Sequence, residues 1–182
     1  MPEKQFSRAR IIAALEALGE DLTEQGIHGQ LFIVGGAAMA LAYSNRRVTK
    51  DINAVFEPKA AIYEAAERVA ERLGLPEDWL NDAVKGFLPG ADRDARPLPE
   101  IRGIEVSTAS PRYLLAMKLL AMRFGEDDDD IRVLLDQTGI ATADEALALM
   151  ARMYPDREPP LKTRLFLGEI LPIDEPDRGA QR

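Results

Sequence analysis

The sequence contains no cysteine, which excludes a disulfide framework, a thiolate metal site and a cysteine nucleophile. A single histidine, His28, excludes zinc sites built from several histidines and makes a histidine-based catalytic triad a poor interpretation. No stretch approaches about 18 consecutive apolar residues, so we expect no membrane-spanning helix. The first residues lead into an amphipathic segment instead of the apolar core of a signal peptide. These absences favour a soluble, cytoplasmic protein.

Positive charge is scarce. The chain has 23 Lys and Arg residues against 31 Asp and Glu residues, which gives a net charge of −8. A broad nucleic-acid footprint normally makes a domain basic, so a role with nucleic acid needs a local basic patch. The stretch YSNRRVTK (43–50) supplies three positive charges and no negative one. The acidic remainder suits solubility or a basic protein partner equally well.

The hydrophobic patterning predicts an α+β fold with a small sheet early in the chain and helices late. Short apolar or alternating runs favour strands at 30–34, 51–56 and 100–107. Helical spacing, or a proline or cap at the start, favours helices at 7–25, 37–43, 59–73, 76–87, 111–124, 128–137, 143–154 and 160–171. Residues 88–99 read as a loop. We expect one domain over 1–171, with the sheet within about 1–125, a helical part at about 126–171 and a flexible tail at 172–182.

Two glycines, Gly35 and Gly36, follow the first expected strand and precede a short helix. Glycines let the backbone come close to a ligand, and the N–H groups of a helix start favour an anion. A tight strand-to-helix turn explains the same pair, and for two glycines alone the turn is the better interpretation.

Asp51 and Asn53 lie two residues apart in the second expected strand, so they share one face. Mg²⁺ takes oxygen ligands, typically one or two carboxylates together with phosphates and water. Glu105 lies between Ile104 and Val106 in the third expected strand and points away from the core if they point into it. Polar residues on the solvent side of a strand are the simpler interpretation of each position taken alone.

Taken in order, these features resemble the nucleotidyltransferase superfamily that includes DNA polymerase β-like enzymes. Members show an apolar strand, a Gly-Gly or Gly-Ser turn, an Asp-x-Asp or Asp-x-Glu pair, and a third acid in a later strand. Asp51 matches the first acid and Glu105 the third. Asn53 departs from the pattern at the second acid, which in the family helps to hold the metals.

A narrower resemblance covers most of the chain. The chain resembles a family of minimal nucleotidyltransferase-like proteins that are grouped with the AbiEii toxins of toxin–antitoxin systems. Five stretches carry the resemblance, in this order: FIVGGAAMAL, TKDINAVFEP, DWLNDAVKGFLP, SPRYLLAMKLLAMR and DDDDIRVLL. AbiEii-like and MenT toxins carry a helical lysine and then an Asp before an apolar residue, and Lys118 and Asp130 fit these places. Asp127 fits the first place of an Asp-x-x-Asp pattern. Without the resemblance, Lys118 reads as a lysine with a buried stem, and the acidic run as a solvated helix start.

The resemblance implies transfer of a nucleoside monophosphate from an NTP to a hydroxyl of RNA, which is tRNA in the toxin relatives, or of a protein. It implies a cognate antitoxin as partner, and it assigns the site residues as follows: Asp51, Asn53 and Glu105 to Mg²⁺ or Mn²⁺; Gly35, Gly36, Lys50 and Lys118 to the nucleotide; and Asp51, Glu105, Lys118 and Asp130 to catalysis. We therefore expect the three metal residues to converge beside the glycine turn. The amide of Asn53 leaves an alternative open, a degenerate protein that binds a nucleotide or a partner with weak or no turnover.

Overall fold

The computed structural model describes residues 5–44 and 47–172, and it confirms an α+β fold with a mixed sheet. The chain divides into two compact units, residues 1–110 and 111–182. This division lies before the helix at 111–124, which was expected to belong with the sheet. The expected tail at 172–182 lies outside the described residues except for Pro172. Within the described ranges, no helix is long and apolar enough to cross a membrane.

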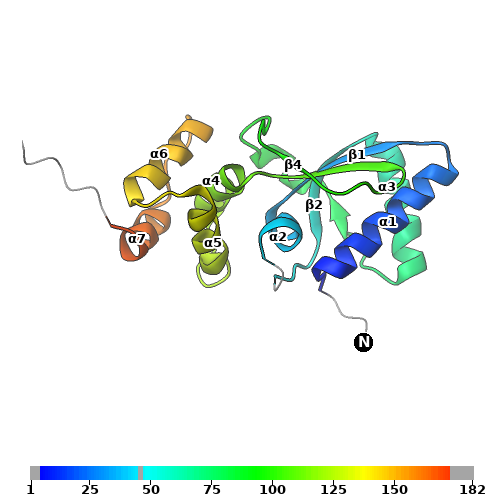
Figure 1. Ribbon diagram of the computed structural model, residues 1–182, viewed down its shortest axis with the longest axis horizontal. Coiled ribbons are helices and arrows are strands. Elements are labelled where there is room, and N and C mark those ends of the chain that lie inside the picture. The colour runs from blue at the N-terminus through cyan, green and yellow to red at the C-terminus, as the bar shows by residue number, and fades with distance from the viewer. Residues whose placement is uncertain (1–4, 45–46, 173–182) are drawn as a thin grey trace, which may run out of the picture. The chain divides into compact units, whose positions relative to one another are not determined.

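The first unit is built on a five-stranded sheet in the order β3-β2-β1-β5-β4 (Figure 1). Its strands are β1 (Gly29–Val34), β2 (Ile52–Glu57), β3 (Leu80–Asn81), β4 (Arg96–Pro97) and β5 (Ile104–Thr108). Its helical segments are α1 (Arg8–Glu24), α2 (Gly35–Ala38), the π-helical η1 (Met39–Tyr43), α3 (Lys59–Leu73) and the 3₁₀ segment η2 (Ala83–Phe87). The central strand β1 runs antiparallel to β2 and parallel to β5.

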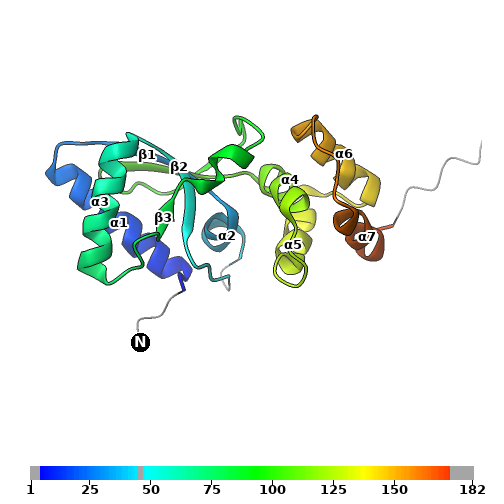
Figure 2. The same ribbon diagram turned by 180° about the vertical axis from the view of Figure 1, so that it is seen from behind.

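Helices α1 and α3 lie together and cover one face of this sheet (Figure 2). A Cβ built on Gly29 in β1 would lie 3.1 Å from Leu22 of α1 and 3.2 Å from Ile62 of α3. The two helices are joined by Arg68, which donates hydrogen bonds to both carboxylate oxygens of the buried Asp21. The polar residues of β2 that matter for the site therefore lie on the other face.

Strand phase is as expected for β2. Ile52, Ala54 and Phe56 are buried, whereas Asn53 and Val55 are partly exposed on the opposite face. The third expected strand begins later than predicted, at Ile104, because residues 101–103 form a turn closed by a hydrogen bond from Ile104 N to Ile101 O (3.2 Å).

The segment expected as a helix at 76–87 is different in the structure. It forms the two-residue strand β3 and then the 3₁₀ segment η2. Two contacts hold it in this form: Ile52 N donates to Trp79 O (2.6 Å), and the indole Nε1 of the fully buried Trp79 donates to Ala66 O in α3 (3.0 Å). Pairing with β2 therefore outweighs the local helical pattern.

The second unit consists of helices throughout its described part. They are α4 (Pro111–Ala121), α5 (Asp128–Thr138), α6 (Ala143–Met153) and α7 (Leu161–Ile170), close to the predicted ranges. A capping box between Thr142 and Glu145 fixes the start of α6. The buried hydroxyl of Thr163 in α7 donates to Leu119 O in α4 (2.7 Å), which ties the last helix to the first.

Replacing Trp79 tests how far β3 depends on the contact with α3. We expect Trp79→Phe to lower the free energy of unfolding by roughly 2 kcal/mol, because it removes a buried hydrogen bond and leaves space where the larger indole packed. Urea unfolding followed by far-UV circular dichroism measures the change. Phe87→Leu is the control, since Phe87 is 62% exposed, and we expect a change within roughly 0.5 kcal/mol. Equal stability of Trp79→Phe and wild type would contradict the anchoring role.

Candidate functional site

The glycine turn joins β1 to α2. Gly35 has a φ of +65°, in the left-handed region that a side chain disfavours. A Cβ on Gly36 would lie 2.8 Å from the hydroxyl oxygen of Thr49, so the close approach of Thr49 requires glycine there. A Cβ on Gly35 would meet no atom within 4 Å, so the space beside that backbone is open. The turn thus has a structural cause, and it also leaves main chain accessible to a ligand.

Asp51 precedes β2 and lies between this turn and β3. Its carboxylate accepts two hydrogen bonds from neutral amides: Asn53 Nδ2 donates to Oδ1 (3.1 Å), and Asn81 Nδ2 donates to Oδ2 (3.0 Å). Asn53 and Asn81 are paired residues of the neighbouring strands β2 and β3. A carboxylate offers about four lone-pair sites, so both oxygens keep room for a further ligand.

Asn81 is the residue of this cluster that the sequence analysis did not identify. Its strand has two residues, too few for any alternation to be visible, and the surrounding segment resembles a helix start after Pro76. The signal that remains is the acidic and amide run in DWLND, which becomes informative only once the pairing of β3 with β2 is known.

Glu105 does not join this cluster, which corrects the expectation that it converges with Asp51 and Asn53. It points away from the core on the same sheet face as Asn53, as expected, but Gln30 is its partner in β1 whereas Val34 is the partner of Asn53. Four residues along β1 amount to ~13 Å, and β2 and β5 are two strand spacings apart, a further ~10 Å. The two residues therefore cannot share one metal ion.

Glu105 instead lines a groove of about 940 Å³ near the start of β1. Its carboxylate accepts a hydrogen bond from Gln30 Nε2 (3.3 Å) and lies 3.7 Å from His28 Nε2. Such contacts are ordinary for neighbouring polar residues on an exposed strand surface.

The metal set implied by the resemblance is therefore reduced to Asp51 and Asn53. Among residues 5–44 and 47–172, no group of three or more His, Asp or Glu side chains is placed to hold a metal ion. One carboxylate with free lone pairs, flanked by two amides that donate to it, fits a hydrated Mg²⁺ or Mn²⁺ that takes its remaining ligands from phosphates and water. It does not fit a cation held by a cage of protein carboxylates. Lys50, next to Asp51, is exposed.

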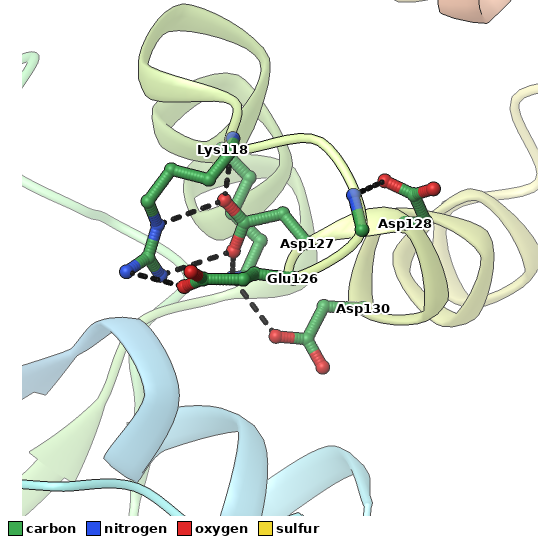
Figure 3. A network of polar contacts seen from close by, with 7 residues as sticks. Lys118, Glu126, Asp127, Asp128 and Asp130 are labelled. Carbon is green, nitrogen blue, oxygen red and sulfur yellow. Dashed lines mark hydrogen bonds and ion pairs between the residues drawn. The ribbon is translucent and has the colours of Figure 1, made fainter.

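Lys118 lies in α4 of the second unit and is buried, with 8% of its surface exposed. Its Nζ forms ion pairs with Asp127 (2.7 Å to Oδ1) and Asp130 (2.9 Å to Oδ2) at the start of α5 (Figure 3). Lys118 and Asp130, the two residues that fit the toxin motif, are thus in contact, and Asp127 is a second partner of Lys118. Asp127 also accepts a hydrogen bond from Arg123 N (2.9 Å).

The positive charges of this cluster lower the pKa of the Asp127 carboxyl. Burial alone would raise the pKa of its carboxyl, but the hydrogen bonds and charges of Lys118 and Arg123 outweigh burial and hold the pKa below its usual 3.8. One lysine here faces two carboxylates, so the cluster first of all holds the lysine amine in place. Nζ donates a hydrogen bond to Asp127 Oδ1 (2.7 Å), whereas its contact with Asp130 is an ion pair.

Asp127→Asn tests this pairing. Because the pKa of Asp127 is lowered in the folded state, its contribution to stability is present above pH 3.8 and is lost as the pH falls through the folded-state pKa. We expect the variant to lose about 1–3 kcal/mol of unfolding free energy at neutral pH, and this difference from wild type to narrow below pH 3.8. Urea unfolding by circular dichroism at a series of pH values measures both effects.

The matched control is Asp129→Asn, in the same acidic run but with an exposed side chain. We expect it to change the unfolding free energy by roughly 0.5 kcal/mol or less, with little dependence on pH. If Asp129→Asn and Asp127→Asn behave alike, the run acts as a solvated helix start and the pairing with Lys118 contributes nothing.

Comparison with known proteins adds no family to this picture. No family model matches the chain, and no curated protein matches it. The similarity to nucleotidyltransferases accordingly stays a prediction that depends on the motifs and on the geometry around Asp51.

Proposed function

We propose that this is a nucleotidyltransferase-like protein that binds a nucleoside triphosphate beside Gly35 and Asp51, with weak or no transfer of the nucleotide to an acceptor. One observation carries the proposal. The carboxylate of Asp51 is contacted by two amides, where the superfamily pattern calls for further acids. The strand pairing that separates Glu105 from Asn53 supports the same conclusion.

Binding would use groups around the glycine turn. The open backbone at Gly35 lets phosphate oxygens come close to main-chain N–H groups. Lys50 is exposed and next in sequence to Asp51, so it can act as a mobile point charge for phosphate oxygens. Asp51 would hold Mg²⁺ or Mn²⁺, which when bound offsets part of the charge of the triphosphate. The amide oxygen of Asn53 would join as a ligand after the amide turns, because its Nδ2 faces Asp51 in the structure.

The number of charges explains why transfer would be weak. In nucleotidyl transfer, positioning and charge neutralisation do most of the work. Asp51 contributes one negative charge against the two positive charges of the cation, so the rest must come from the triphosphate. We therefore expect the cation to bind together with the nucleotide and only poorly before it. The acceptor hydroxyl, in turn, would have one carboxylate in place of three to orient and activate it.

An active transferase is the second candidate, and the Lys118 cluster favours it. A buried lysine held by two aspartates is costly to desolvate, and the resemblance assigns this lysine to the nucleotide and both the lysine and Asp130 to catalysis. In that case the acceptor would be RNA, with tRNA the first to test, or a protein. The net charge of −8 would fit a basic partner such as a cognate antitoxin.

Calorimetry with each NTP in Mg²⁺ or Mn²⁺ tests the proposal, together with transfer of label from each NTP to total RNA and protein. We expect the wild type to bind a metal–NTP complex. Asp51→Ala should weaken this binding at least about tenfold, because it removes a direct metal ligand, and loss of a residue that merely orients a metal ligand already lowers metal affinity by about that factor. Wild-type transfer should be weak or absent. Failure of the wild type to bind any NTP would reject the nucleotide proposal.

Asn53→Asp separates the two candidates. Without metal it should lower the melting temperature, because it replaces a hydrogen bond to Asp51 with a like charge. Mg²⁺ with NTP should restore the stability, and label transfer should appear or increase. Strong transfer by the wild type that is lost in Asp51→Ala would instead establish the active transferase.

A further inference from the structure

The four residues 79–82 connect α3 to the Asp51 site. Each of them makes a specific contact. Trp79 and Asp82 bind α3, the buried Leu80 pairs with Ile52 in β2, and Asn81 donates to Asp51. The amide that contacts Asp51 therefore belongs to a segment fixed on both sides.

The anchor after Asn81 is ionic. Asp82 accepts a hydrogen bond from the hydroxyl of Tyr63 (2.6 Å) and pairs with the amine of Lys59 (2.5 Å), both from α3. These two contacts hold the pKa of Asp82 below its usual value, so Asp82 stays ionised and bound at neutral pH. Asn81 is consequently held at a fixed distance from α3 and from β2.

The two ends of the Asn81 amide have different partners. Its Oδ1 accepts a hydrogen bond from Ala83 N (3.3 Å), which orients the group, and its Nδ2 then points to Asp51 Oδ2 (3.0 Å). Asn53, the other donor, is only two residues from Asp51 along the chain. Asn81 comes from a different strand and thus fixes the Asp51 carboxylate relative to the rest of the sheet.

We propose that Asn81 is a positioning residue, which holds the Asp51 carboxylate in the orientation that receives a metal-bound triphosphate. The inference rests on the proposed nucleotide site and adds to it a residue from outside the motif around Asp51. A residue that orients a metal ligand typically affects metal affinity 10–100-fold when it is removed. A purely structural amide would change stability and leave affinity as it was.

The test uses the full chain and the Mn²⁺ complex of inorganic triphosphate, because the triphosphate group is common to all NTPs. Calorimetry well below the unfolding temperature compares wild type, Asn81→Ala, Asp51→Ala and the double variant. We expect Asn81→Ala to weaken binding about tenfold or more. In the Asp51→Ala background the same change should have no further effect, because Asn81 acts through Asp51.

Ile62→Val is the control for stability. Ile62 is fully buried in α3 of the same unit and far in sequence from β3, and its change should lower the unfolding free energy by about 0.5–1.5 kcal/mol while leaving affinity unchanged. Binding that is lost in Asp51→Ala but kept in Asn81→Ala overturns this inference alone. Wild-type binding that persists in Asp51→Ala, or no wild-type binding at all, overturns the proposed function and the inference with it.

Discussion

The site in the first unit depends on one arrangement, in which the carboxylate of Asp51 accepts hydrogen bonds from the amides of Asn53 and Asn81. It needs β2 in the correct phase, so that Asn53 shares the face of Asp51, and it needs β3 beside β2. The second condition requires α3 to bind residues 79–82 through Trp79 and Asp82. A helix on one face of the sheet thereby determines a polar contact at its edge.

Local sequence patterns predict the strands and helices whose residues follow a regular period. The alternation in β2 predicted which residues are buried, and the proline and glycine that flank α3 predicted its range, Lys59–Leu73. The AbiEii-like motif singled out Lys118 and Asp130, which the structure brings into contact. For β2 and α3 the information lies within a few residues of the feature itself.

Pairing between distant segments was not predictable in this way. The two residues of β3 carry no period, so a helical pattern there was a reasonable but wrong prediction. For Glu105, strand phase predicted the correct face, but its position along the sheet is set by the register of β5 on β1 and of β1 on β2. A register is a relation among three strands, and no single stretch of sequence contains it. Site residues that a motif places in order along the chain can therefore lie at opposite ends of one sheet.

The polar clusters around Lys118 and Asp51 differ in how the central charge is compensated. Lys118 is buried against Asp127 and Asp130, so its charge is fully matched within the protein. Asp51 is partly exposed, and among residues 5–44 and 47–172 the contacts of its carboxylate are with two amides, which orient its charge without cancelling it. An aspartate at position 53 would repel Asp51 until a cation arrived, whereas the amide stabilises the metal-free state and lowers the gain from binding. The Asn53 amide thus favours a site in which the triphosphate must bring most of the negative charge that holds the cation.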